Sequence, residues 1–259
     1  MKTNYHLPVL YQEVIDNLIT RKDGVYMDCT LGGGGHSEGI LNNISDKGYL
    51  IAIDQDTDAI KFAQERLEKY KGRFSIFKEN FVNMDIVLYM AGYEKATGIL
   101  MDIGVSSKQF DNPERGFSYR FDAKLDMRMD KENPISAYEI INEYPEDKLS
   151  KIIFEYGEER FARKIAAAIV RSRESKKIET TFELVDIIRR AKKTKTLKHP
   201  AKQTFQALRI EVNQELEVLE KAIEKAVDLL EVGGRLGIIT FHSLEDRIVK
   251  NAFRRLEKG

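Results

Sequence analysis

Short apolar runs alternate with longer segments of helical periodicity over the first hundred residues. After each run, apolar residues recur at the spacing of one helix face, and this alternation is typical of a parallel sheet covered by helices. Strands are predicted at 25–30, 49–53, 74–77 and 97–101, and helices at 36–44, 56–70 and 84–91. The pattern therefore predicts an α/β protein.

Glycines, acids and an aromatic residue follow the predicted strands. The run Gly32–Gly35 and His36 come after the first strand, Asp54 after the second, Phe81 after the third and Asp102 after the fourth. Ligands of such sheets bind beyond the carboxyl ends of the strands. We therefore expect these residues to share one binding site.

The glycine turn favours one class of cofactor. The G-x-G-x-x-G fingerprint of dinucleotide-binding proteins does not fit, because its third glycine would fall on Ser37 or Glu38. Asp28 precedes Gly32 by four residues, and this order is nearer to the D-x-G-x-G-x-G loop with which methyltransferases bind S-adenosylmethionine. Thr30 stands at the first glycine position. Glycine lets the backbone approach a ligand where a Cβ atom would clash.

Two residues in this interpretation also have an ordinary alternative. Asp54 fits an acceptor for the hydroxyls of a ribose, or a helix N-terminal charge beside Asp56 and Asp58. Phe81 fits packing on adenine, or a plain core position.

Composition excludes several classes of protein. The 259 residues are 42% hydrophobic and 32% charged, which is compatible with a large buried core and not with disorder. The single cysteine excludes an internal disulfide, and four scattered histidines give no metal-ligand spacing. No apolar run is long enough to cross a membrane, and the first ten residues do not have the pattern of a signal peptide. We expect a cytoplasmic protein without a metal.

The formal net charge of zero hides a basic segment at 171–202. It carries four acidic residues against eleven basic ones, a net charge of +7. The segment is either a solvated helical face or a surface for phosphate groups. Its basic residues are Arg171, Arg173, Lys176, Lys177, Arg189, Arg190, Lys192, Lys193, Lys195, Lys198 and Lys202.

A long segment without periodicity, 102–130, follows the fourth predicted strand, and loops of this length are usually functional or disordered. With other blocks it carries a resemblance over nearly the whole chain. The sequence resembles the bacterial MraW/RsmH family of small-subunit ribosomal RNA methyltransferases. The matching blocks are His6 to Val9 with Glu13, 28–37, 102–130, 157–159, 204–209 with Asn213 and Glu215, and 233–250.

This resemblance implies an enzyme that methylates the exocyclic 4-amino group of a cytidine in the decoding region of small-subunit RNA. The expected partner is this RNA within the assembled small subunit. S-adenosylmethionine is the implied cofactor. The alternative from another class is a non-catalytic RNA-binding or ribosome-assembly factor that retains the fold. The cofactor contacts carried over by the resemblance are Gly34, Gly35, His36, Asp54, Phe81, Asp102 and Gln109.

The family also implies a Rossmann-like sheet, in residues 1–109 and 211–259, with a mostly helical, partly basic RNA-recognition domain inserted at 110–210. Helices are predicted at 148–156, 160–173 and 211–230, and a strand at 235–240 after a stop at Gly233 and Gly234. Family members continue for some tens of residues, so we expect the final strands to be missing from a chain that ends at Gly259.

Methylation of an amino group needs an acceptor for its hydrogens. Asp102 is either this catalytic acceptor or a cofactor ligand, and His242 and Ser243 are further acceptor candidates; His242 alternatively caps a helix. In the loop, charged residues fit RNA contacts or an internal ion-pair network, and aromatic residues fit base stacking or packing. The charged loop residues are Arg115, Asp126, Arg128 and Asp130, and the aromatic ones are Phe117 and Tyr119.

Overall fold

The computed structural model describes residues 8–193 and 199–258, and the chain divides into two compact units. Unit 1 comprises Met1–Gly104 and Leu216–Gly259, and unit 2 comprises Val105–Glu215. The predicted divisions, after residues 109 and 210, lie five residues from these boundaries.

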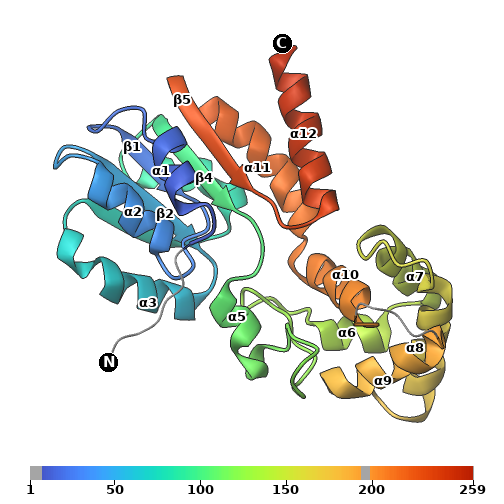
Figure 1. Ribbon diagram of the computed structural model, residues 1–259. Helices are drawn as coiled ribbons and strands as arrows, with labels where there is room; N and C mark the ends of the chain where they lie inside the picture. Colours follow the sequence, from blue (N-terminus) through green and yellow to red (C-terminus); the bar gives the residue numbers. More distant parts are fainter. Residues whose placement is uncertain (1–7, 194–198, 259) are drawn as a thin grey trace. The chain divides into compact units, whose positions relative to one another are not determined.

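Unit 1 is a parallel five-stranded sheet with helices on both faces (Figure 1). The strand order is β3-β2-β1-β4-β5, and every neighbouring pair is parallel, which confirms the predicted Rossmann-like α/β class. The strands are β1 (Val25–Asp28), β2 (Tyr49–Asp54), β3 (Phe74–Lys78), β4 (Ala96–Asp102) and β5 (Leu230–Ile239). The helices are α1 (Tyr11–Leu18), α2 (Gly35–Asn43), α3 (Thr57–Leu67), α4 (Met84–Met90), α11 (Glu215–Leu229) and α12 (Ser243–Glu257), with 3-10 turns at Glu68–Tyr70 and Phe81–Asn83.

Alternation along the strands builds two cores. In β2, Leu50 and Ala52 face the core that α1, α2 and α3 cover, whereas Ile51 and Ile53 face the core that α4, α11 and α12 cover. All four side chains are fully buried. A strand buried on both faces reads as a continuous apolar run, which is the reason that the pattern located β1 to β4.

Two predictions around β5 are wrong. The helix predicted at 211–230 is divided at Gln214, which adopts a left-handed conformation (φ 51°) between α10 and α11. Gly233 and Gly234 do not stop a helix; they lie inside β5, where the pairing with β4 shifts between Ala96 and Gly98. A Cβ atom on Gly234 would lie 3.0 Å from the Thr97 carbonyl oxygen, so the glycine pair allows a strand irregularity.

Unit 2 is helical. Its core is formed by α6 to α10 together with Phe117, Leu125, Met127 and Met129 of the segment before α6. Two helices begin with a capping box, Ser136 with Glu139 and Thr180 with Glu183. The helices are α5 (Ser107–Asp111), α6 (Ala137–Glu143), α7 (Glu146–Glu155), α8 (Ala162–Ser175), α9 (Thr181–Lys192) and α10 (Lys202–Asn213), with a 3-10 turn at Pro113–Arg115. Among the described residues, no helix has the length and apolar character needed to cross a membrane.

Candidate cofactor and substrate site

The ends of β1 and β4 are joined by Thr30. The backbone N–H of Asp102 donates to Thr30 Oγ1 at 2.7 Å, and the N–H of Thr30 donates to Asp28 Oδ1 at 3.1 Å. Ser37 Oγ donates to the other oxygen of Asp28 at 2.6 Å. Burial raises the pKa of Asp28, although the bond from Ser37 opposes this shift. Asp28 is therefore engaged in holding the turn after β1.

Asp54, at the end of β2, is bonded to two neighbouring segments. Its Oδ2 accepts from the N–H of Gly32 at 2.7 Å and its Oδ1 from the N–H of Asp56 at 2.8 Å. Asp56, and not Asp54, caps α3 by accepting from the N–H of Asp58. Burial raises the pKa of Asp54 to about 6, although the two backbone donors oppose the shift. Each carboxylate oxygen has a second lone pair, which remains suited to a hydroxyl donor.

The glycine turn lies against α3. Gly34 has φ 73°, and a Cβ atom there would lie 3.2 Å from Ala63 Cβ, so the position is restricted by conformation and by space. Arg66 Nη1 donates to the Gly33 carbonyl oxygen at 3.1 Å, and Arg66 Nε donates to Glu38 of α2 at 2.8 Å. The guanidinium thus connects α3 with both the turn and the helix that follows it.

Buried polar atoms at the start of α2 and at the end of β4 fit a ligand-binding site. His36 is buried and Asp102 is partly buried, and the nearest atoms of the two side chains, Nε2 and Oδ2, are 3.6 Å apart. Among the described residues, neither ring nitrogen of His36 nor Oδ1 of Asp102 has a hydrogen-bond partner. Buried polar groups are normally satisfied, so these atoms fit a polar ligand at this edge of the sheet. The residues present thus fit S-adenosylmethionine, which offers amino, carboxylate and hydroxyl groups.

The two remaining residues of the proposed cofactor set differ in their surroundings. Phe81 begins the 3-10 turn after β3 and packs, partly buried, against the core below α4. Gln109 is buried in α5 of unit 2, where its Oε1 accepts from the Ser106 N–H at 3.1 Å.

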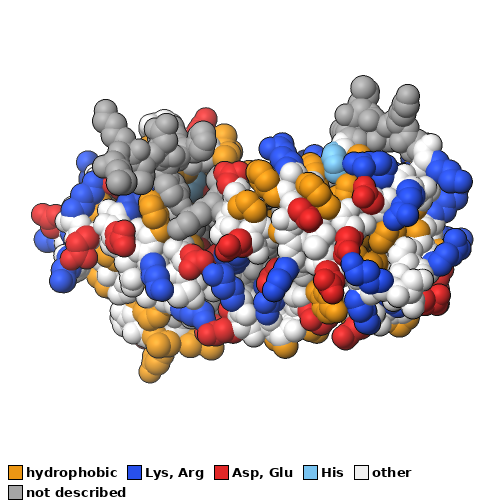
Figure 2. Space-filling view, turned by 90° about the horizontal axis from the view of Figure 1, so that it is seen from below, with side chains coloured by type: hydrophobic (Ala, Val, Ile, Leu, Met, Phe, Trp, Pro, Cys, Tyr) orange, Lys and Arg blue, Asp and Glu red, His pale blue; other side chains and the backbone are white. Residues whose placement is uncertain are grey.

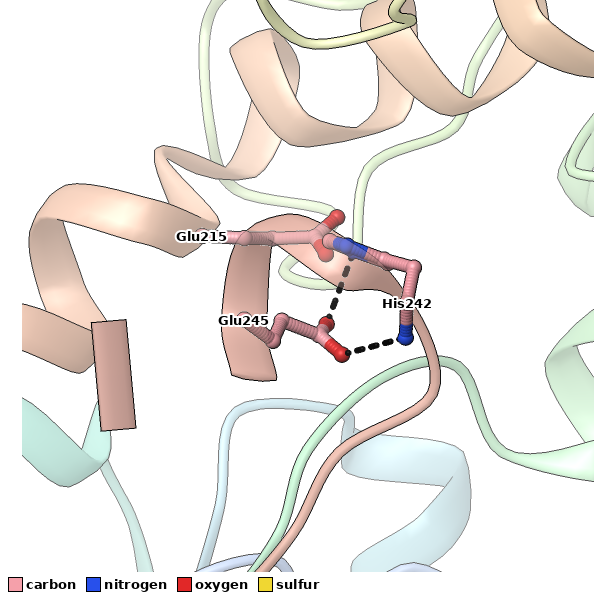
Figure 3. A group of neighbouring side chains, drawn as sticks. All are labelled: Glu215, His242 and Glu245. Atoms are coloured by element: carbon pink, nitrogen blue, oxygen red, sulfur yellow. Dashed lines mark hydrogen bonds and ion pairs between the residues drawn. The ribbon is translucent and has the colours of Figure 1, made fainter. Parts of the chain in front are cut away.

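The end of β5 carries His242 and Ser243, of which Ser243 is exposed. Figure 3 shows the imidazole of His242 facing the fully buried carboxylate of Glu245, with Nε2 and Oε1 3.0 Å apart. The second oxygen, Oε2, accepts from the backbone N–H groups of Phe241 and His242 at 2.8 and 3.3 Å. His242 stands at the N-cap of α12, in line with the capping alternative. Glu245 fixes the turn between β5 and α12.

The charged loop residues form an internal network in unit 2. Arg115 is buried and donates to the carbonyl oxygens of Arg128 and Met129. Arg128 and Asp126 form a bidentate pair, with 2.9 and 2.8 Å between their nitrogen and oxygen atoms. Burial opposes ionisation of Asp126, but hydrogen bonds from Arg128 outweigh it and lower the pKa of the carboxyl. The structure favours the ion-pair alternative for these side chains over RNA contact.

The loop aromatics are packed as well. Phe117 is buried in the core of unit 2, which excludes base stacking without opening that core. Tyr119 is half-buried, stacked on His199 with 4.2 Å between ring centroids and in edge contact with Phe205. Packing is again the favoured alternative.

The basic side chains of the segment are exposed at all but two of its described positions, Arg173 and Lys192. Lys192 is buried in a pair with Glu159, 2.5 Å between Nζ and Oε2, and also donates to the Pro200 carbonyl oxygen. Arg173 donates to the carbonyl oxygens of Ile141 and Tyr144. Lys177, although exposed, reaches the Asn142 carbonyl oxygen. The exposed side chains beside these are Arg171, Lys176, Arg189, Arg190, Lys193 and Lys202, whereas Lys195 and Lys198 lie outside the described residues.

Sequence reasoning missed several residues that build the site. Thr30 was noted only as a substitute for glycine, whereas its hydroxyl bonds the end of β4. Arg66 carried no signal, because it acts on a segment that is distant in sequence. Glu245 falls in a block that matches the family, but no pattern encodes the geometry of the turn that it holds.

Comparison with known proteins places the chain among methyltransferases. Residues 3–259 match the model of the MraW methylase family. A protein of Fusobacterium nucleatum named ribosomal RNA small subunit methyltransferase H is 64% identical over 253 residues, covering 98% of this chain and 81% of that protein. A protein of the same name from Clostridium botulinum strain Kyoto is 57% identical, covering 98% of this chain and 82% of that protein.

Proposed function

The chain belongs to the MraW methylase family, and from this premise we propose that it transfers a methyl group from S-adenosylmethionine to small-subunit ribosomal RNA. The acceptor in this proposal is the exocyclic 4-amino group of a cytidine in the decoding region. The observation that supports it best is the unsatisfied pair His36 and Asp102 beside a glycine turn, at the ligand-binding edge of a parallel sheet.

The proposed cofactor contacts are the residues that the family resemblance carried over. When bound, S-adenosylmethionine supplies an electrophilic methyl group on a sulfonium. Asp54 accepts the ribose hydroxyls, Phe81 packs on the adenine, and the turn at Gly34 and Gly35 admits the amino-acid part. Gln109 is retained as a contact on the strength of the family resemblance.

Asp102 is the proposed acceptor for the amino hydrogens. The lone pair of a cytosine amino group is delocalised into the ring, so the group is a weak nucleophile that gains from an acceptor and from exact placement. Oδ1 of Asp102 is partnerless in the described chain and lies at a strand end. His242 is less suited, because its Nε2 faces Glu245.

Unit 2 contributes a surface for the RNA backbone. Figure 2 shows lysine and arginine side chains (blue) gathered on the part of the molecule that holds α8 and α9. Arg189, Arg190 and Lys193 are exposed at the end of α9 and attract phosphates through charge. The proposed substrate is the assembled small subunit, and the proposed location is the cytoplasm, where ribosomes assemble in bacteria.

The test is methyl transfer from labelled S-adenosylmethionine to small ribosomal subunits that lack the modification, in parallel with naked ribosomal RNA. We expect label in the RNA of the assembled subunits. Binding of subunits without transfer of label would instead support the RNA-binding or assembly-factor alternative.

A further inference from the structure

An exposed aromatic ring lies beside the proposed reaction site. Phe241 lies two residues after the end of β5, the strand paired with β4 so that Asp102 and Ile239 are register partners. Its side chain is 57% exposed, although phenylalanine is usually buried. The ring approaches the turn after Asp102, since a Cβ atom on Gly104 would lie 3.3 Å from Phe241 Cδ2.

The backbone around this ring is fixed from two sides. Oε2 of the fully buried Glu245 accepts from the Phe241 N–H at 2.8 Å, and the same carboxylate is held by His242 (Figure 3). Gly104 has φ 124°, where a side chain would be strained and would also meet the ring. The hydrogen bond from Glu245 therefore fixes the backbone of Phe241, and the glycine at position 104 leaves space for its ring.

Stability alone does not account for this arrangement. An exposed phenylalanine gains little from burial, and burying it elsewhere would contribute about 2 kcal/mol. A base that is to be methylated must be turned out of its stack and held at the reaction site. Aromatic side chains hold such bases by stacking, and β4 supplies no aromatic residue, since Asp102 is followed by Ile103, Gly104 and Val105.

We propose that Phe241 stacks on the target base and so presents its amino group to Asp102. This inference rests on the proposed function and adds to it the contact that positions the substrate. Phe241 is a substrate-binding residue in this account, and Glu245 is a positioning residue that acts through the backbone of the turn.

The test compares four variants at one position, measured with unmethylated small subunits and S-adenosylmethionine. Phe241→Ala is expected to lower kcat/KM for subunits about tenfold or more, because base stacking contributes about 1–3 kcal/mol per base. Phe241→Leu keeps apolar bulk without a ring and is expected to lose as much. Phe241→Tyr and Phe241→Trp keep a stacking face and are expected to stay within about threefold of the wild type.

Two controls separate stacking from a general defect. The affinity for S-adenosylmethionine and the melting temperature are expected to stay at the wild-type value in all four variants. Phe253→Ala removes another exposed phenylalanine, from α12 of the same unit, and is expected to leave kcat/KM unchanged.

Equal kcat/KM in the leucine and tyrosine variants would overturn the proposal, as would a loss confined to cofactor affinity. A wild-type chain that transfers no methyl group to subunits would contradict the proposed function itself, which is a different outcome.

Discussion

The carboxylate of Asp54 accepts the backbone N–H of Gly32 at 2.7 Å, which ties the end of β2 to the glycine turn after β1. The residue proposed to read the ribose thus also holds the turn proposed to read the amino-acid part. Asp54 thus links both parts of the proposed cofactor site, and we expect its ionisation to affect both.

Cofactor affinity is therefore expected to depend on pH. Burial raises the pKa of Asp54 to about 6 in the folded chain, from an ordinary value of 3.8, so the carboxyl binds a proton as the pH falls through 6. Hydroxyl donors favour the ionised form, and one proton must leave on binding, so the dissociation constant is expected to rise about tenfold between about pH 7 and pH 5. Titration calorimetry between about pH 5 and pH 7 measures this dissociation constant.

Asp54→Asn provides the matched variant for that measurement. It removes the ionisation, so the affinity is expected to be lower by about tenfold to a hundredfold at neutral pH and nearly independent of pH below 7. An unchanged pH profile in this variant would assign the titration to another group.

Protein stability is expected to show the opposite dependence on pH. Since the folded pKa is raised, the folded chain holds a proton that the unfolded chain has lost between pH 3.8 and about 6. The contribution of Asp54 to stability is therefore present at low pH and is lost as the pH rises through 6. Denaturant unfolding of the unliganded chain measures this. The free energy of unfolding of Asp54→Asn is expected to depend less on pH in this window than that of the wild type.

Arg66 is expected to support cofactor binding without contacting the cofactor. Arg66→Ala removes the donor to the Gly33 carbonyl oxygen and leaves Glu38 with Lys69 as its partner. We expect S-adenosylmethionine to bind about tenfold more weakly, with kcat nearly unchanged at saturation. Lys69→Ala is the control, since it removes the exposed partner of Glu38 and leaves the glycine turn unchanged. A comparable loss of cofactor affinity in both variants would show that the ion pairs of Glu38 matter, and not the bond from Arg66 to the turn.

The basic end of α9 is expected to act through charge alone. Replacing Arg189, Arg190 and Lys193 by Gln is expected to weaken binding of the small subunit and to flatten its salt dependence, with cofactor affinity unchanged. Lys192 is excluded from the set, because its replacement would leave Glu159 buried without its partner. If the affinity for the small subunit depends on salt concentration as in the wild type, these residues form a solvated helical face and do not bind phosphates.

The sequence located the elements whose signal is local. Strands such as β2 are continuous apolar runs bounded by polar residues, and Asp54 and Asp102 fall at their ends because parallel strands share one ligand edge. The break at Gln214 escaped prediction because the apolar period continues across it. What ends α10 there is partly tertiary: Asn213 donates to the Met127 carbonyl oxygen and accepts from the Met129 N–H, both distant in sequence.

The same limit applies to the site. Arg115 and Arg128 are indistinguishable in sequence from RNA-binding arginines, and only their carbonyl and carboxylate partners show that they hold the loop together. Conversely, Phe241 is unremarkable as an apolar residue after a strand, and its exposure is visible only in the folded chain.

Nucleoside analysis by mass spectrometry tests the proposed reaction most directly, with small-subunit RNA taken after reaction with the wild type and with Asp102→Asn. We expect N4-methylcytidine as the only new nucleoside with the wild type. With the variant, we expect the rate to fall by about a hundredfold or more, because a group that accepts a proton in the transition state contributes a factor of about 10² to 10⁴ to the rate. A methyl group on a ring carbon or a ribose, or an Asp102→Asn variant that forms N4-methylcytidine at the wild-type rate, would contradict the proposed reaction.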